Sequence, residues 1–160
     1  MANVFNAAEV IDMGIEKEKK RRDFYGAVAE KFTAKEMKDL FTRLRDWEDT
    51  HIKKFAEIRD SIEESEATES YRGELASYMK ATIDDILYNQ VSAGEFGKNV
   101  KTELAAIQYG MGFEKDAILF FNELAKYMPA YHKEKVQELV EEEKKHLVFL
   151  AELKKKYTKI

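Results

Sequence analysis

The sequence predicts an all-α protein that folds as an antiparallel four-helix bundle with one long crossover between the second and third helices. The 160 residues include a single Pro and 36% charged residues, a composition typical of long amphipathic helices. Four stretches repeat apolar residues at every third or fourth position. The segment between the second and third stretch, residues 63–98, is long enough to cross the length of a bundle, whereas the other two junctions are short. We expect one domain over residues 1–160.

The first predicted helix spans about residues 4–32. Its inner line, meaning the positions expected to face the bundle centre, comprises Ile11, Ile15, Glu18, Tyr25, Ala29 and Phe32. Arg22 falls on this line as a polar exception.

The second predicted helix spans about residues 34–62, and Thr33 with Glu36 matches a capping box at its start. Its inner line alternates steps of four and three residues: Met37, Phe41, Leu44, Glu48, His51, Phe55, Ile58 and Ile62. A carboxylate and an imidazole therefore occupy consecutive places in a line of apolar residues.

The second half of the chain begins after the crossover. Residues 63–70 are polar and acidic, residues 71–90 predict a shorter helix, and a Gly-containing break follows at 92–97. Long helices are predicted over about 99–128 and 130–157, separated by Pro129. Their inner lines are Leu104, Ile107, Met111, Glu114, Ile118, Phe121, Ala125 and Met128, and then Val136, Leu139, Glu143, His146, Leu150, Leu153 and Tyr157.

The two halves also repeat each other. A displacement of 96 residues places Ile11, Gly14, Glu18, Lys19, Phe24 and Ala29 on Ile107, Gly110, Glu114, Lys115, Phe120 and Ala125. A displacement of 95 places Leu44, Glu48 and His51 on Leu139, Glu143 and His146. Two helical hairpins of one pattern predict a bundle with pseudo-twofold symmetry.

The polar residues on the inner lines predict a metal site. Residues three apart share a helix face, so a Glu and a His at that spacing can reach one point. Burying a carboxylate without compensation is costly, and four close together also repel one another. Two divalent cations would neutralise the four carboxylates, with two imidazoles completing the ligands. The predicted metal ligands are Glu18, Glu48, His51, Glu114, Glu143 and His146.

Simpler interpretations apply to several nearby residues. The E-x-x-H spacing alone is weak in a Glu-rich helical chain, and it gains weight because both pairs fall on inner lines at repeat-equivalent positions. His132 lacks such a partner, so we expect an ordinary residue near a helix start. Three further glutamates point away from the inner lines and are expected to be solvated: Glu16, Glu141 and Glu142.

Tyr25 and two glycines each allow two interpretations of their role. We favour core packing for Tyr25, and the alternative is that its hydroxyl hydrogen-bonds a ligand or a metal-bound oxygen species. Gly14 and Gly110 precede the key glutamates by one turn, where they allow close helix approach or leave a small void beside the metals.

Composition argues against several classes of functional site and partner. The chain has no Cys, which removes disulfides, thiolate nucleophiles, iron–sulfur clusters and Cys-ligated zinc. The net charge of −4 is spread without a basic stripe, so no nucleic-acid partner is expected. No apolar run reaches the length of a membrane span and no signal-peptide pattern is present, so we expect a soluble cytoplasmic protein with no membrane partner.

The six predicted ligands, with the strings IEKEKKRRDFY and FEKDAILFF, resemble the ferritin-like superfamily of di-iron carboxylate proteins, and most closely its rubrerythrin branch. The resemblance covers the four long helices. It implies that Glu18 and Glu114 each ligate one ion or bridge both, and that Glu48 and Glu143 take the other of these two roles. It also implies that His51 and His146 each give one nitrogen to one metal. Rubrerythrins also carry a Cys-rich rubredoxin module, absent here, and a further Glu one turn beyond the third-helix ligand, where this chain has Ala117.

This resemblance and the ligand set together give a functional expectation. Carboxylate and imidazole ligands suit two iron ions, and they also admit manganese or zinc. We expect a di-iron oxidoreductase that reacts with O2 or peroxide, either as a ferroxidase or by reducing peroxide, with no catalytic residue beyond the metal ligands. The alternatives are a non-catalytic metal-binding or iron-storage module and a metal-free interaction bundle. An external electron-donor protein and a homodimer or higher homo-oligomer are also expected.

Overall fold

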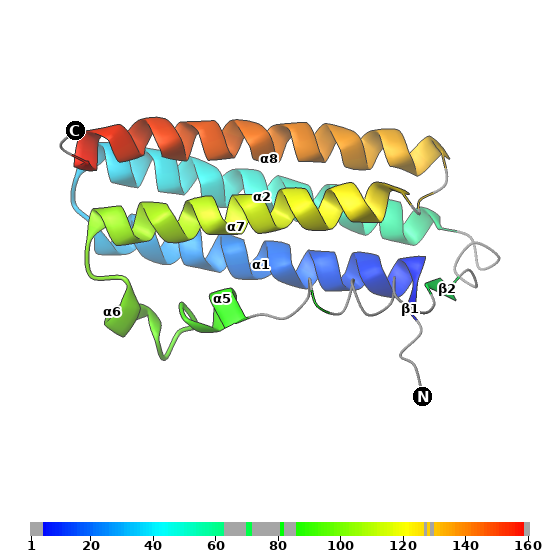
Figure 1. Cartoon of the computed structure of the whole chain (residues 1–160), viewed down its shortest axis with the longest axis horizontal. Coiled ribbons are helices and arrows are strands. Elements are labelled where there is room, and N and C mark those ends of the chain that lie inside the picture. The colour runs from blue at the N-terminus through cyan, green and yellow to red at the C-terminus, as the bar shows by residue number, and fades with distance from the viewer. Residues whose placement is uncertain are drawn as a thin grey trace.

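The computed structural model describes residues 5–62, 70–71, 81, 86–126, 128 and 130–158. Four long helices dominate this part of the chain, and the predicted all-α bundle is confirmed (Figure 1). They are α1 (Ala7–Lys31), α2 (Lys35–Ser61), α7 (Glu103–Lys126) and α8 (Ala130–Tyr157).

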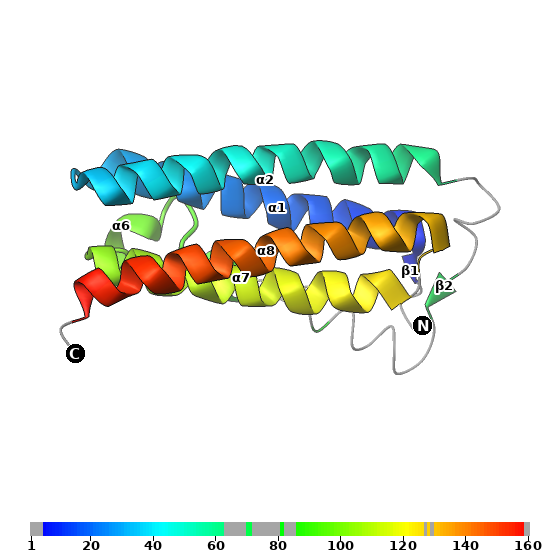
Figure 2. The same cartoon turned by 90° about the horizontal axis from the view of Figure 1, so that it is seen from above.

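The long helices form two hairpins that pack against each other. Helix α1 packs along α2, and α7 packs along α8; the hairpins then meet through α1 against α7 and α2 against α8. Figures 1 and 2 show that neighbouring helices run antiparallel, while α2 and α7 run in the same direction. Two helices of the same direction need a connection that returns along the bundle, which explains the length of the crossover.

The described part of the crossover contains two short helices, α5 (Ile86–Asn89) and α6 (Phe96–Asn99). Most of the helix predicted over 71–90 lies outside the described residues. A two-residue strand β1 (Phe5–Asn6) pairs antiparallel with β2 (Ser70–Tyr71), a contact that the sequence did not predict.

One predicted helix start and one predicted helix cap are wrong. Helix α7 begins at Glu103 rather than near 99, because residues 96–99 form the separate helix α6 and the Thr102 hydroxyl accepts a hydrogen bond from the Ala105 amide at 3.1 Å. Helix α2 has Ala34 as its N-cap without a side-chain cap, so the predicted capping box does not form. Glu36 instead accepts a hydrogen bond from the Tyr157 hydroxyl at 2.9 Å, which ties α2 to the end of α8.

The long helices are amphipathic, and their inner lines agree largely with prediction. In α2, every residue of the predicted line is buried except the half-buried Ile62. In α1 the predicted line is wrong at two points, because Ile15 and Arg22 are only half-buried, whereas Arg21 and Lys17 are buried. In the described residues, no helix is long and apolar enough to cross a membrane.

The buried core has two apolar clusters with a polar layer between them. One cluster includes Phe24, Phe41 and Leu150, and the other includes Ile11 and Phe55. The polar layer lies at the intervening turns of all four long helices. Its carboxylates are 0% exposed: Glu18, Glu48, Glu114 and Glu143.

Candidate metal centre

The structure brings all six predicted ligand residues together in the buried polar layer. They form two groups of potential ligands, and in each group the ligand atoms lie within 4.8 Å of one another. The first group contains Glu18, Glu48, His51 and Glu143, and the second contains Glu48, Glu114, Glu143 and His146. Glu48 and Glu143 belong to both groups, so the two potential ion positions are adjacent and share these two carboxylates.

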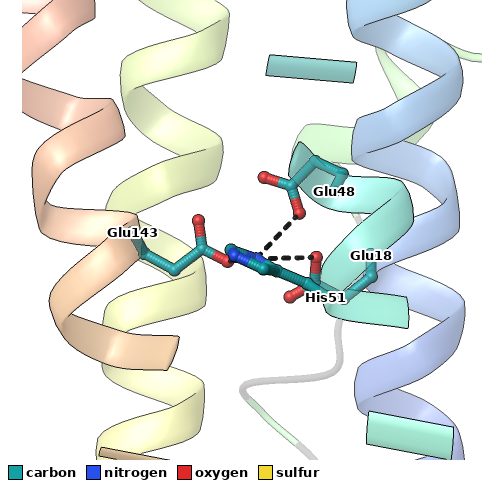
Figure 3. A group of neighbouring side chains, drawn as sticks. All are labelled: Glu18, Glu48, His51 and Glu143. Carbon is teal, nitrogen blue, oxygen red and sulfur yellow. Dashed lines mark hydrogen bonds and ion pairs between the residues drawn. The ribbon is translucent and has the colours of Figure 1, made fainter. Parts of the chain in front are cut away.

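Figure 3 shows the first group, in which the carboxylates of α1, α2 and α8 surround the His51 ring. His51 Nδ1 lies 2.9 Å from Glu143 Oε1, 3.7 Å from Glu48 Oε2 and 3.9 Å from Glu18 Oε2. The ring therefore directs one nitrogen into the layer.

The second group repeats this arrangement on the other side of the layer. His146 Nδ1 lies 2.9 Å from Glu143 Oε2, 3.7 Å from Glu48 Oε1 and 3.7 Å from Glu114 Oε1. Glu48 and Glu143 thus each direct one oxygen toward His51 and the other toward His146. This is the arrangement expected of carboxylates that bridge two ions.

The carboxylate oxygens test whether a pair of ions fits. Both oxygens of Glu18, both oxygens of Glu48 and Glu114 Oε2 are buried and make no hydrogen bond within the protein. Buried carboxylate oxygens without hydrogen bonds are costly, and bound cations are one of the few ways to satisfy them. The donor set of four carboxylates and two imidazoles suits a pair of divalent transition-metal ions. The residues present therefore fit a di-metal centre.

Two residues of α1 hold the outer carboxylates in place. The Tyr25 hydroxyl donates a hydrogen bond to Glu114 Oε1 at 2.5 Å. Arg21 Nη2 lies 2.6 Å from Glu18 Oε1, an ion pair that lacks hydrogen-bond alignment, and Arg21 Nη1 donates to the Tyr88 hydroxyl at 2.8 Å. Core packing alone, the interpretation favoured for Tyr25, is therefore incomplete: its ring packs in the core, and its hydroxyl contacts a candidate ligand.

The two histidines are supported differently on their outer sides. His51 Nε2 lies 2.7 Å from Glu142 Oε2, and Lys54 donates to the other oxygen of that carboxylate at 3.2 Å. Such a carboxylate behind a metal-binding histidine fixes the orientation of the ring. The His146 ring instead stacks on Trp47, with the centroids 4.8 Å apart and the planes 8° apart.

Comparison with known proteins agrees with this architecture. A family model of rubrerythrin sequences matches residues 9–154. The chain belongs to the rubrerythrin family. No curated protein sequence matches it. A solved structure from Thermotoga maritima, described as a ferritin-like diiron-carboxylate protein, is 21% identical with a TM-score of 0.78, and the match covers 99% of this chain and 100% of that chain. At this identity the match shows a common ferritin-like fold.

Some residues of this rubrerythrin-family chain lie where the sequence did not place them. Glu142 was expected to be solvated, but it contacts His51 across the α2–α8 interface. Arg21 was not singled out, although it lies three residues after Glu18 and therefore on the same helix face, a spacing that could have revealed it. Glu16 and Glu141 are exposed, as expected. His132 is buried in the first turn of α8 and belongs to neither group.

The two glycines one turn before Glu18 and Glu114 permit close packing. A Cβ on Gly14 would lie 3.0 Å from Phe120 Cε1, and a Cβ on Gly110 would lie 3.2 Å from Leu150 Cδ1. Neighbouring side chains therefore occupy the space beside both glycines, which supports the first of the two alternatives, close helix approach.

Burial and mutual repulsion make the metal-free layer retain protons. Burial raises the pKa of Glu18 and of Glu114 well above the ordinary value, and the charges of Glu48 and Glu143 raise both further. Burial alone would lower the pKa of the two histidines. Contacts with the surrounding carboxylates outweigh it, and they raise the pKa of His51 to about 12 and that of His146 to about 11. Burial also raises the pKa of Glu48 and of Glu143. Arg21 and other close side chains outweigh it at Glu48 and lower its pKa to about 2, and hydrogen bonds from His146 and His51 lower the pKa of Glu143.

These shifts predict that the metal-free protein is more stable at about pH 5.5 than at about pH 8. Groups with a raised folded-state pKa, here the two histidines, Glu18 and Glu114, stabilise the fold at low pH and lose that contribution as pH rises through the folded pKa. The opposite contribution of Glu48 and Glu143 is complete above their ordinary pKa of 4.5 and is lost only as pH falls below it. The melting temperature of chelator-treated protein, followed by circular dichroism, measures the difference.

The metal-loaded protein provides the control, because protons compete with metal for the same ligands. Its melting temperature should fall over the same decrease in pH. A metal-free protein whose melting temperature also falls steadily from about pH 8 to about pH 5.5 would contradict the raised pKa values.

Proposed function

We propose that this rubrerythrin-family protein is a di-iron oxidoreductase that reacts with dioxygen or peroxide. The observation that carries the proposal is the pair of adjacent ligand groups that share Glu48 and Glu143. A single-ion site would need only one such group. Iron is proposed as the metal because carboxylate-rich sites with imidazole suit it, and manganese or zinc are the competing candidates.

The shared carboxylates define the chemistry that the centre supports. Each of them directs one oxygen toward His51 and the other toward His146, an arrangement that would hold two ions close enough to react with one small molecule. When bound, two ferrous ions supply the two electrons that, with two protons, convert one peroxide to two waters. No protein nucleophile is needed for this reaction.

The surrounding protein orients the ligands and limits access by solvent. The four carboxylates are 0% exposed, and apolar clusters lie on both sides of their layer. Tyr25 fixes one oxygen of Glu114, Arg21 contacts one oxygen of Glu18, and Glu142 fixes the His51 ring. A dry site of fixed geometry favours two-electron chemistry over release of reactive species into solution.

Sustained turnover requires electrons from elsewhere. The chain has no Cys and so provides no rubredoxin-type centre of its own. We therefore propose a separate electron-transfer protein as the partner. Without it, the ferrous protein should be oxidised once and then stop.

Ferrous-loaded protein is expected to consume one peroxide per two irons, faster than free ferrous ion does under the same conditions. Stopped-flow absorbance follows formation of the ferric centre, after an anaerobic titration that saturates at two ions per chain. Glu18→Gln and Glu114→Gln should each abolish the rapid phase, because each removes a charged oxygen that holds one ion of the pair.

His132→Ala serves as the matched control, since this histidine is buried in α8 but belongs to neither ligand group. Its oxidation rate should equal that of the unmodified protein. Oxidation no faster than in free solution, or a rapid phase that survives Glu114→Gln, would favour a metal-binding or storage module without this redox activity.

A further inference from the structure

The pseudo-twofold repeat relates the ligands to one another, but it does not extend to the residues around them. The displacement of 96 that places Glu18 on Glu114 also places Arg21 on Ala117 and Tyr25 on Phe121. The displacement of 95 that relates the two E-x-x-H pairs places Trp47 on Glu142. The two ion positions therefore have equivalent ligands and different surroundings.

The clearest difference lies at the two outer carboxylates. In each, α1 contacts Oε1: Arg21 Nη2 lies 2.6 Å from Glu18 Oε1, and the Tyr25 hydroxyl lies 2.5 Å from Glu114 Oε1. In each, Oε2 makes no hydrogen bond within the protein and is free to bind an ion. One carboxylate is thus held by a full positive charge, and the other by a neutral phenol.

Arg21 changes the charge balance of the layer. Its side chain is 0% exposed and lies beside Glu18, which belongs to the first group alone. Its Nε lies 3.8 Å from Glu48 Oε2, the oxygen of that shared carboxylate that faces His51. One divalent ion leaves a layer of four carboxylates and one guanidinium negative, whereas a second ion makes it positive. The adjacent buried Lys17 is paired with Asp116 at 3.0 Å and adds no net charge with that partner.

The negative charge of Glu142 has the opposite effect, since it attracts a cation to the first position, and this effect is weaker than the repulsion by Arg21. Its carboxylate contacts His51, but it is 37% exposed and also lies 3.2 Å from Lys54 Nζ. Solvent and that lysine screen its charge. Arg21 is shielded from water, so its repulsion of a cation acts through a lower effective dielectric.

We propose that Arg21 makes the two positions unequal, so that metal fills the Glu114–His146 position first and the Glu18–His51 position second, with lower affinity. The inference rests on the di-metal centre of the proposed function. The second ion should bind roughly tenfold or more weakly than the first.

Trp47 gives a measurement that distinguishes the two positions. It is the only tryptophan in the chain, and its ring stacks on His146, the histidine of the position proposed to fill first. A paramagnetic ion bound to His146 should quench its fluorescence strongly. An ion beside His51 is one ring further from the indole, because the His51 ring stacks on the His146 ring, with the centroids 5.4 Å apart, and Trp47 stacks on the His146 ring.

The test is an anaerobic titration with Co²⁺, followed both by calorimetry and by Trp47 fluorescence. Two binding steps are expected, with most of the quenching in the first. His146→Ala should remove the first step and its quenching. His51→Ala should remove the second step and leave the quenching.

Variants at position 21 test whether Arg21 causes the difference in affinity between the two positions. Arg21→Gln and Arg21→Met should bring the second affinity to within severalfold of the first, and Arg21→Lys should keep the two steps apart. Arg22→Gln is the matched control, since it removes a cation from the next residue of α1, where the partners are Asp23 and Asp49. It should leave both steps unchanged.

Two failures are distinguishable. Two equal binding steps in the unmodified protein, or an affinity ratio unchanged in both Arg21→Gln and Arg21→Met, would overturn this inference and leave the di-metal centre intact. Absence of any saturable Co²⁺ binding would overturn the di-metal centre as well.

Discussion

Replacing Glu143 with Leu is expected to abolish binding of both metal ions, whereas replacing Glu114 with Leu should abolish binding of one. The difference follows from geometry: Glu143 directs one oxygen toward His51 and the other toward His146, while Glu114 belongs to the second group alone. Loss of even an indirect support of a metal ligand lowers affinity by about 10–100-fold, so loss of a shared ligand should exceed that at both positions. Metal content after equilibrium dialysis gives the stoichiometry directly.

Further variants provide controls for this pattern. Glu48→Leu should behave like Glu143→Leu, because Glu48 is also shared. Leu is close to Glu in volume and carries no charge, so these variants remove the ligand without opening a large cavity. His132→Ala should bind two ions. If Glu143→Leu retained one tightly bound ion, the shared-carboxylate arrangement would be wrong.

The fold and the six candidate ligands could be predicted because both depend on spacing within single helices. Glu48 with His51, and Glu143 with His146, are separated by three residues, and this spacing fixes a common face whatever the helix packs against. Their repetition in both halves then indicates that the hairpins face each other. The same logic placed Glu18 and Glu114, which fall on inner lines of otherwise apolar residues.

The contacts between helices could not be predicted in the same way. Glu142 lies next to a ligand on α8 and contacts His51 on α2, a pairing that depends on the rotation and separation of the two helices. The stacking of Trp47 on His146 depends on the same interface. A pattern of exposed and buried positions along one helix does not specify which side chains of a second helix it will contact.

Arg21 is a different case. Its place on the same helix face as Glu18 follows from their spacing, but its charge argues against burial. A strict apolar pattern places Arg22 near the inner line of α1, and an arginine at the preceding residue is expected to be solvated. Burial of Arg21 becomes favourable only because Glu18 and Tyr88 are there to contact it. The partner Tyr88 belongs to the short helix α5 of the crossover, which the helical pattern of the bundle does not include.

Removing the metal is expected to lower the melting temperature by about 10–20 °C. At a free concentration of about one hundred times the Kd, each ion stabilises the folded state by about 2.7 kcal/mol. For a chain of this size, about 1 kcal/mol corresponds to about 2–4 °C in melting temperature. The metal-free protein should remain helical, because the two apolar clusters on either side of the layer do not depend on the ions.

The Glu143→Leu variant separates this effect from non-specific binding of cations to the acidic surface. Its melting temperature should respond little to added metal, because neither ligand group is complete. Without metal it should melt below the unmodified protein, since Glu143 lies 2.9 Å from both His51 Nδ1 and His146 Nδ1 and its loss leaves two buried cationic rings without their nearest carboxylate. Calorimetry of both proteins with chelator and with saturating Mn²⁺ gives the four melting temperatures. An equal shift on metal addition in both proteins would place the stabilising ions outside the buried layer, and the metal centre would then have to be abandoned.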